Sequence, residues 1–223
     1  MKIATFVLTA FQQNTRVVSC EETRKAICID PGEPSPEVAA YILDNNIDVV
    51  AIIATHGHLD HVGGTAFMKE EFPTAEVLVH KEEEPLYFAL PQQPLAMGIA
   101  PHQMAAMGMD YTDPPPPDRN PAHGEILEVG NLRFEFRHCP GHTLGHVVIV
   151  EHTERVVFTG DCLFNRTIGR TDLPGGDHAQ LIASIHQNLL SLDDDYVAYC
   201  GHGPETTIGA ERTGNPFLNG LYA

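Results

Sequence analysis

The sequence predicts an α+β protein in which two β-sheets pack face to face and helices cover their outer sides. Three observations support this prediction. Strand patterns fall into two groups, one in each half of the chain; helical patterns lie mostly between strands; and 43% of the 223 residues are apolar, enough for a substantial core. The length suits a single domain over residues 1–223.

The first half alternates short apolar runs with turn residues, which is typical of strands. The run IDVVAIIAT is continuously apolar, so we expect a strand buried on both faces. The stretch SPEVAAYILDNN predicts a helix, because Ser35 can cap it and Pro36 suits its first turn. The expected strands are 3–10, 16–20, 25–30, 47–55 and 75–80, and the expected helices are 35–46 and 63–72.

The second half repeats this organisation. The stretches EILEV and LRFEFRHC alternate apolar and polar residues, as half-buried strands do. The run DHAQLIASIHQNLLSL predicts a long helix. The expected strands are 125–129, 132–139, 146–151, 155–161 and 195–203, and the expected helix is 177–192.

Between the halves, residues 85–121 form an insertion rich in proline and methionine. The tetraproline at 114–117 indicates a stiff spacer rather than a domain boundary. Two interpretations of the methionines remain open, the core of a helix or an adaptable apolar lid. These methionines are Met97, Met104, Met107 and Met109.

The cysteines and the first residues favour a cytoplasmic protein. The five cysteines are scattered, odd in number and contain no C-x-x-C pair, a usage typical of reducing compartments, where cysteines mostly pack as small buried residues. The start MKIATFVLTAF resembles a short signal peptide but lacks a small-x-small cleavage site, so we expect a first strand there. No apolar run approaches the length of a membrane span.

The charge of the chain limits its partners. Thirteen Lys and Arg residues stand against 30 Asp and Glu residues, which gives a formal net charge of −17. Such a chain repels phosphate backbones and anionic membranes, so we expect neither nucleic acid nor a membrane as a partner. An anionic small-molecule substrate would need cations or metal placed locally in its site. The oligomeric state is left open.

The stretch THGHLDH at 55–61 places three histidines and an aspartate within seven positions, directly after the apolar run 47–55. Later expected strands also lead into histidine or aspartate, in CPGHTLGH, FTGDC and CGHGP. One tetrahedral ion needs about four ligands, so seven candidates fit two ions that share a carboxylate. Nitrogen and oxygen donors without thiolate suit zinc, iron or manganese. The candidates are His56, His58, Asp60, His61, His142, Asp161 and His202.

In this order, THGHLDH, CPGHTLGH, TGDCLF and YCGHGP resemble the motifs of the metallo-β-lactamase superfamily, whose fold is a four-layer αββα sandwich. The stretches GDCLFNRTIGRTDLPGGD and GHGPETTIGAERTGNPF further resemble type II glyoxalases, the hydroxyacylglutathione hydrolases, in their short bacterial forms. The resemblance extends over nearly the whole chain. It implies a first ion bound by His56, His58 and His142, a second bound by Asp60, His61 and His202, and a bridge through Asp161.

The resemblance implies a metal-dependent thioesterase that cleaves S-acylglutathione, such as S-lactoylglutathione, to glutathione and a hydroxy acid. Two divalent ions, zinc or else iron or manganese, would lower the pKa of a shared water, and the hydroxide would attack the thioester carbonyl. Asp60 would orient this nucleophile, so Asp60 and Asp161 are expected to be catalytic as well as ligands. Arg166 and Arg170 follow Asp161 closely and could bind a substrate carboxylate.

One departure from the glyoxalases concerns the thiol. Their full-length forms carry a C-terminal helical domain that supplies cations to glutathione. This chain ends at residue 223, soon after His202, so we expect no such domain. Arg212 and Asn215 could substitute for it.

Other functions remain as alternatives. A persulfide dioxygenase would use a single iron bound by His56, His142 and Asp161. A lactonase or a β-lactamase-like hydrolase of the same superfamily is the other alternative. A nuclease is disfavoured by the acidic charge, and a metal-free scaffold by the filled ligand positions. In each enzyme we expect the insertion 85–121 to lie over the metal site and shape the substrate pocket.

Overall fold

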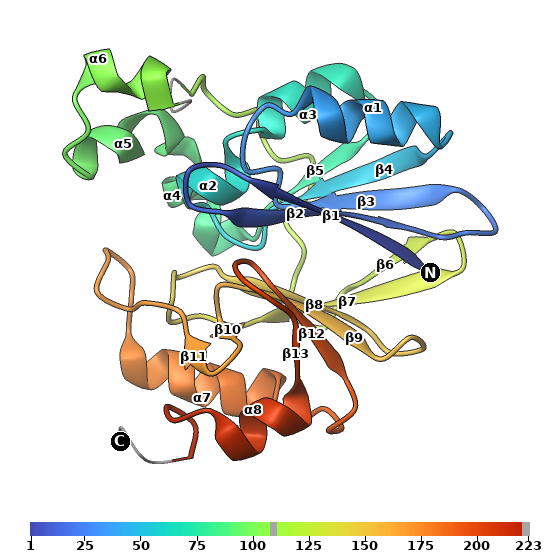
Figure 1. Ribbon diagram of the computed structural model, residues 1–223, viewed down its shortest axis with the longest axis vertical. Helices are drawn as coiled ribbons and strands as arrows, with labels where there is room; N and C mark the ends of the chain where they lie inside the picture. The colour runs from blue at the N-terminus through green and yellow to red at the C-terminus, as the bar shows by residue number, and fades with distance from the viewer. Residues whose placement is uncertain (108–110, 220–223) are drawn as a thin grey trace. The chain divides into compact units, whose positions relative to one another are not determined.

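The computed structural model describes residues 1–107 and 111–219 and contains two compact units. The first unit consists of residues 1–120 together with 129–131, and the second of residues 121–128 together with the chain from 132 onward. Each unit is built on one main sheet with helices on one of its faces (Figure 1). Within the described ranges, no helix is long and apolar enough to cross a membrane.

The first unit contains a five-stranded sheet in the order β1-β2-β3-β4-β5. The strands β1 to β3 pair antiparallel, whereas β3, β4 and β5 run parallel. Buried side chains of the helices α1 and α3 pack on this sheet in one apolar cluster, for example Ile42 and Met68 against Val17 and Ile52. The elements are β1 (Lys2–Leu8), β2 (Gln13–Ser19), β3 (Lys25–Ile29), α1 (Pro36–Asp44), β4 (Asp48–Ile53), α2 (Leu59–Val62), α3 (Thr65–Glu71), β5 (Glu76–Leu78) and the 3₁₀ turn η1 (Lys81–Glu83).

The first helix begins where the sequence predicts. The Ser35 hydroxyl accepts a hydrogen bond from the backbone N–H of Val38 at 3.3 Å, and Pro36 occupies the first turn. The helix buries Val38, Ala39 and Ile42 and ends before Asn45. A capped, amphipathic segment of this kind covers a sheet face because its apolar residues recur at helical spacing.

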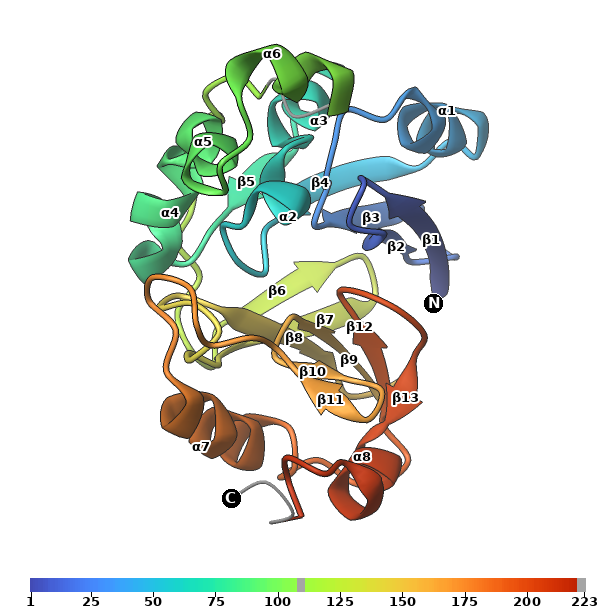
Figure 2. The same cartoon turned by 60° about the vertical axis from the view of Figure 1, so that its left-hand side comes forward.

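The insertion forms a series of short helical turns instead of one long helix, because prolines at 85, 91, 94 and 101 interrupt the pattern (Figure 2). Its elements are α4 (Glu84–Phe88), η2 (Leu90–Gln92), α5 (Gln93–Ala96), α6 (Pro101–Met104) and η3 (Ala105–Met107). The interpretation as helix core fits Met104, which is 8% exposed, but not Met97 and Met107, which are 53% and 44% exposed; the lid stays a prediction. Met109 lies outside the described residues.

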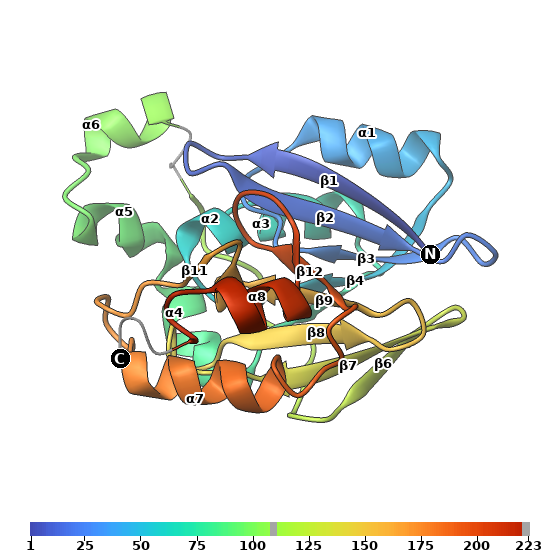
Figure 3. The same cartoon turned by 60° about the horizontal axis from the view of Figure 1, so that its bottom comes forward.

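The second unit contains a six-stranded sheet in the order β13-β12-β9-β8-β7-β6 (Figure 3). The helices α7 and α8 share one apolar cluster with this sheet, in which Leu181, Ile185 and Ile208 pack with Val148 and Val157. The elements are β6 (Ile126–Val129), β7 (Leu132–His138), β8 (Val147–Glu151), β9 (Val156–Gly160), β10 (Leu163–Phe164), β11 (Thr167–Ile168), α7 (His178–Asn188), β12 (Val197–Cys200), β13 (Thr206–Thr207) and α8 (Ile208–Gly214).

Strand direction determines where the candidate ligands of this unit lie. The strand β8 is antiparallel to both β7 and β9, and β12 is parallel to β9. Therefore β7, β9 and β12 all point the same way, and the residues that follow them meet at one edge of the sheet. The hairpin β10–β11, the strand β13 and the helix α8 were not expected from the sequence.

Candidate metal centre

In the first unit, a buried aspartate connects the ends of two parallel strands. Asp30 follows β3, and Thr55 follows its parallel neighbour β4. The Asp30 carboxylate accepts hydrogen bonds from the backbone N–H and the hydroxyl of Thr55, both at 2.7 Å. It also accepts one from Nδ1 of His61 at 2.9 Å. One carboxylate after β3 therefore hydrogen-bonds both the first and the last residue of the loop 55–61 that carries the histidines.

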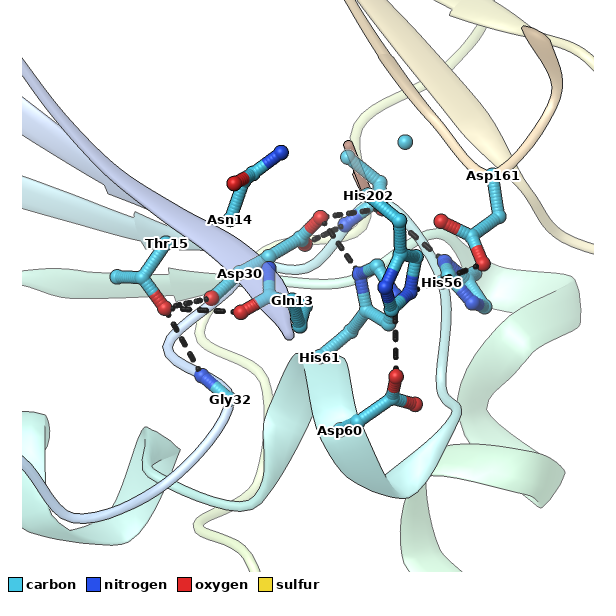
Figure 4. Close-up of polar contacts among 12 residues, drawn as sticks. Gln13, Asn14, Thr15, Asp30, Gly32, His56, Asp60, His61, Asp161 and His202 are labelled. Carbon is cyan, nitrogen blue, oxygen red and sulfur yellow. Dashed lines mark hydrogen bonds and ion pairs between the residues drawn. The ribbon is translucent and has the colours of Figure 1, made fainter. Parts of the chain in front are cut away.

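Asp30 is itself held in a left-handed backbone conformation, with φ 51°. Its carbonyl oxygen accepts a hydrogen bond from the Thr15 hydroxyl at 2.7 Å, and the same hydroxyl oxygen accepts one from the N–H of Gly32 at 3.2 Å. Figure 4 shows these contacts and the Asp30 carboxylate reaching His61. Thr15 of β2 and the turn after β3 thus hold the backbone of Asp30 in place.

The four candidate ligands of this unit converge in the loop 55–61. The ring centroids of His56 and His58 are 4.8 Å apart, and the two rings are nearly perpendicular. The ring centroids of His56 and His61 are 4.0 Å apart. Nε2 of His61 is 3.8 Å from Oδ2 of Asp60. His56 and His61 are fully buried, whereas His58 and Asp60 are partly exposed.

In the second unit, Asp161 lies beside two histidines. It follows β9, His202 follows the parallel neighbour β12, and His142 lies in the loop between β7 and β8. Oδ2 of Asp161 is 3.5 Å from Nε2 of His202 and 3.8 Å from Nε2 of His142. The structure therefore places two candidate ligands, His142 and His202, around one carboxylate oxygen of the third, Asp161.

These separations fit donors prepared for a metal better than donors bonded to each other. Distances of 3.5 and 3.8 Å between nitrogen and oxygen are longer than a hydrogen bond. Two ligands that each lie ~2.0–2.1 Å from a tetrahedral ion are about 3.3–3.4 Å apart. The donor set is imidazole and carboxylate, which zinc, iron and manganese accept.

Hydrogen bonds also select which nitrogen each histidine presents. Nδ1 of His142 donates to the carbonyl oxygen of Arg170 at 2.8 Å. Nδ1 of His61 donates to Asp30, and Nδ1 of His56 donates to the Thr55 hydroxyl at 3.1 Å, whose own proton goes to Asp30. With Nδ1 protonated in all three rings, the lone pair is on Nε2, the arrangement common for metal-binding histidines.

His146 follows the loop of His142 and is fully buried. It contacts the backbone of Asp161. Its Nε2 accepts the backbone N–H of Asp161 at 3.0 Å, so Nδ1 carries the proton and faces Sγ of Cys162 at 3.2 Å. The Cys162 thiol donates to the carbonyl oxygen of Cys139 at 3.2 Å. All five cysteines are buried thiols outside any disulfide.

The cations predicted for substrate binding contact the protein itself. Nη1 of Arg166 donates to the carbonyl oxygen of Ala210 in α8 at 2.8 Å. The exposed guanidinium of Arg170 makes two hydrogen bonds with Asp172, at 2.7 and 2.8 Å, which raises the pKa of Arg170 and lowers that of Asp172 to about 2. Both arginines remain solvent-exposed, and their substrate role stays a prediction.

Arg212 and Asn215, the two C-terminal residues considered for glutathione binding, also form hydrogen bonds within the protein. Arg212 donates to Asp194 at 2.8 Å and to the carbonyl oxygens of Leu190 and Leu192. The fully buried Asn215 donates to the carbonyl oxygen of Thr167 at 3.0 Å. Asn215 therefore supports the hairpin β10–β11 after Asp161, whereas Arg212 supports the segment that follows α7.

Sequence reasoning missed several residues around the ligand loop. Asp30 has a sequence signal, a carboxylate directly after a buried strand and before Pro-Gly. Glu83 and Gln93 bond the backbone of the ligand loop and have no such signal. Tyr111 lies near Asp60, and burial together with the carboxylates of Asp60 and Glu33 raises its pKa, so the phenol stays protonated.

Comparisons with known proteins agree with this geometry. Residues 8–202 match the model of the metallo-β-lactamase superfamily. The chain is 40% identical over 220 residues to the hydroxyacylglutathione hydrolase GloC of Haemophilus influenzae, covering 98% of this chain and 99% of the relative. Among solved structures it is similar to the B3 metallo-β-lactamase BLEG-1, with TM-score 0.84, 33% identity and coverage of 97% and 99% of the two chains. It is also similar to TTHA1623 in a di-iron-bound form, with TM-score 0.83, 35% identity and coverage of 96% and 100%.

These similarities extend over almost the whole chain, and the structural relatives share its fold. They confirm the fold class that the sequence predicts, the αββα class, and they confirm the family from which the ligand assignments were taken. Proteins with this fold bind divalent metal ions, and the histidine and aspartate clusters in the described residues suit that chemistry. The chain belongs to the metallo-β-lactamase superfamily.

Proposed function

We propose that this metallo-hydrolase cleaves S-acylglutathione thioesters, such as S-lactoylglutathione, with two divalent ions, and that zinc is the metal. His56, His58 and His142 would bind the first ion, and Asp60, His61 and His202 the second. Asp161 would bridge both ions. The substrate is a small molecule, and neither nucleic acid nor a membrane is a partner.

The observation that carries this proposal is the arrangement of Asp161. One oxygen of its carboxylate faces Nε2 of both His142 and His202, which belong to different ions in the proposed scheme. Its distances of 3.5 Å to His202 and 3.8 Å to His142, one histidine of each set, support a bridging role for Asp161. The di-iron-bound form of TTHA1623 supports a two-ion site in this fold.

The thioester preference has two supports. The first is the 40% identity to a relative named as a hydroxyacylglutathione hydrolase. The second is chemical: a thiolate with an ordinary pKa of about 8.5 leaves without first taking up a proton, whereas a lactam nitrogen leaves poorly. When bound, divalent ions lower the pKa of water and polarise a carbonyl, which suffices for a thioester.

The residues of this chain would position that chemistry. Asp60 would orient the attacking water as well as bind the second ion. Asp30 would keep His61 in the tautomer that presents Nε2, and the Arg170 carbonyl would do the same for His142. Arg166 would meet a carboxylate of glutathione, since its exposed guanidinium follows Asp161 closely in the chain.

The test combines metal analysis with a substrate panel on the purified wild-type protein and on Asp161→Asn. We expect two ions per wild-type chain, a kcat/KM for S-lactoylglutathione far above that for a penicillin, and loss of nearly all activity in Asp161→Asn. The panel also contains a lactone and glutathione persulfide, and oxygen uptake is recorded with the persulfide.

Each alternative has its own outcome in this panel. One ion at full activity, together with oxygen uptake, would contradict the hydrolase proposal in favour of a persulfide dioxygenase. Comparable rates on the thioester and the penicillin, or a preference for the lactone, would contradict the thioesterase assignment while leaving the metal assignment in place.

A further inference from the structure

The glycine between the two neighbouring histidines is bonded on both sides by side chains of the insertion and of the turn before it. Oε1 of Glu83 accepts the backbone N–H of Gly57 at 2.8 Å. Nε2 of Gln93 donates to the carbonyl oxygen of Gly57 at 2.7 Å. Gly57 lies between His56 and His58, so both peptide groups that join these ligands are fixed from outside the loop.

Gln93 makes two further contacts with the same carboxamide. Its Oε1 accepts the N–H of Leu59 at 2.8 Å, and its Nε2 also donates to the carbonyl oxygen of Leu86 at 3.0 Å. One side chain therefore joins the first residues of α2, the middle of the ligand loop and α4. Buried backbone groups that lose such partners cost free energy, so this arrangement is stable only when both amide ends are present.

The backbone of α4 approaches the ligand loop closely. A Cβ atom on Gly57 would lie 2.7 Å from the backbone nitrogen of Tyr87, which leaves no room for a side chain. Tyr87 is fully buried, and its hydroxyl donates to the carbonyl oxygen of Pro115 at 2.8 Å. Figure 2 shows α4 and α5 beside α2, and the contacts of Gly57 and Leu59 place them there.

Glu83 differs from its neighbours in the same turn. It is 1% exposed, whereas Glu82 is exposed to solvent. Burying a carboxylate is costly unless hydrogen bonds compensate for the lost water. The contact with Gly57 is one such bond, and it joins the buried carboxyl group to the peptide next to His56.

We propose that Glu83 and Gln93 are positioning residues for metal binding: they hold Gly57 so that His56 and His58 face one ion. This inference rests on the proposed function, which assigns both histidines to the first ion. A loop with two ligands on alternate residues can turn either imidazole away when its peptide planes rotate. The insertion, expected from the sequence to shape a pocket, thus also fixes the geometry of the metal ligands.

The test uses matched pairs of variants. Glu83→Leu and Gln93→Leu remove the hydrogen bonds to Gly57. Glu83→Gln keeps an oxygen that can accept the Gly57 N–H. Gln92→Leu makes the same change as Gln93→Leu at the exposed neighbouring glutamine. Metal affinity is measured by equilibrium competition with a chromophoric chelator, and the absorption spectrum of the cobalt(II) form reports the ligand geometry.

We expect Glu83→Leu and Gln93→Leu to weaken metal binding about 10- to 100-fold, the range for residues that orient metal ligands. Both should also change the cobalt spectrum. Glu83→Gln should retain affinity within about threefold, and Gln92→Leu should match the wild type. Unchanged affinity in both leucine variants would overturn the inference, whereas absence of metal binding by the wild type would overturn the proposed function and the inference with it.

A measurement without metal covers the case of poor folding. In the apo protein, hydrogen exchange of the Gly57 and Leu59 amides should accelerate in Glu83→Leu and Gln93→Leu, while β4 keeps its protection. Exchange that increases equally in β4 and the ligand loop would indicate general destabilisation and would refute a specific positioning role.

Discussion

Two histidines lie at opposite ends of β8 and use their nitrogens for different purposes. His146 precedes the strand, is fully buried and accepts the backbone N–H of Asp161 with Nε2. His152 follows the strand, is half exposed and bonds the Tyr196 hydroxyl and the Glu135 carboxylate, at 2.8 and 2.7 Å. Only the first is connected to the proposed bridging ligand, so residue type alone does not tell them apart.

The two nitrogens of His146 can be tested separately. A glutamine can place its amide oxygen near the position of Nε2, whereas an asparagine can only reach the position of Nδ1. We expect His146→Asn to reduce metal affinity or kcat about 10-fold or more and His146→Gln to retain most of both. Metal affinity, from competition with a chelator, and kcat measured against pH check this, with His152→Asn and His152→Gln as controls. Equal losses in the two His146 variants would show that the ring serves packing only.

The candidate ligands could be predicted from the sequence because four of them lie within seven residues and the others follow strand ends. The residues that hydrogen-bond these ligands and their loop could not be predicted. Asp30 contacts His61 across a separation of 31 residues, and Gln93 contacts Leu59 across 34. Such pairs have no local periodicity. The parallel pairing of β3 and β4 brings Asp30 to the ligand loop, and the fold of the insertion brings Gln93 to Leu59.

At the scale of elements, the long strands and the helices α1 and α7 could be predicted from apolar spacing and caps. The hairpin β10–β11 and β13 have strands of two residues, too short for an alternating pattern. They exist because the buried carboxylate of Glu211 accepts hydrogen bonds from the N–H of Arg166, from Thr206 and from Asn215. A long-range hydrogen-bond network thus stabilises a region where propensity is weak.

Arg166 connects this network with the proposed substrate site. Its guanidinium donates to the carbonyl oxygen of Ala210, in the first turn of α8, at 2.8 Å. We expect Arg166→Ala to lower the free energy of unfolding by about 0.5–1.5 kcal/mol, the usual net contribution of a hydrogen bond. It should also lower kcat/KM for S-lactoylglutathione up to about fivefold, the range of an exposed ion pair. Thermal melting and kinetics measure the two effects.

The two roles of Arg166 can be separated by a second substrate and a second variant. An alkyl thioester without carboxylates should be hydrolysed equally by wild type and Arg166→Ala, and Arg166→Lys should recover part of the glutathione-thioester rate. An equal fall on both thioesters would leave only the structural role.

At the scale of the whole molecule, charge and metal binding are linked. The formal net charge is −17, and within the first unit the carboxylates of Asp30 and Asp60 both lie beside the His61 ring. Without cations these carboxylates repel one another, and the repulsion opposes folding. Divalent ions would offset part of the charge at the place where it is most concentrated.

Metal removal should therefore destabilise the protein strongly. The proposed ligands come from positions between 56 and 202, so a bound ion restrains most of the chain, and the unfolded chain cannot present this set. An ion at 100 times its Kd stabilises the folded state by about 2.7 kcal/mol, which for a chain of this length corresponds to a fall in Tm of roughly 5–11 °C on removal. Thermal melting with and without a chelator measures the fall, and zinc added in excess of the chelator should reverse it. Asp161→Asn should melt near the chelated wild type and respond much less to the chelator. A wild-type Tm unaffected by metal removal would contradict the linkage between the acidic ligand set and folding.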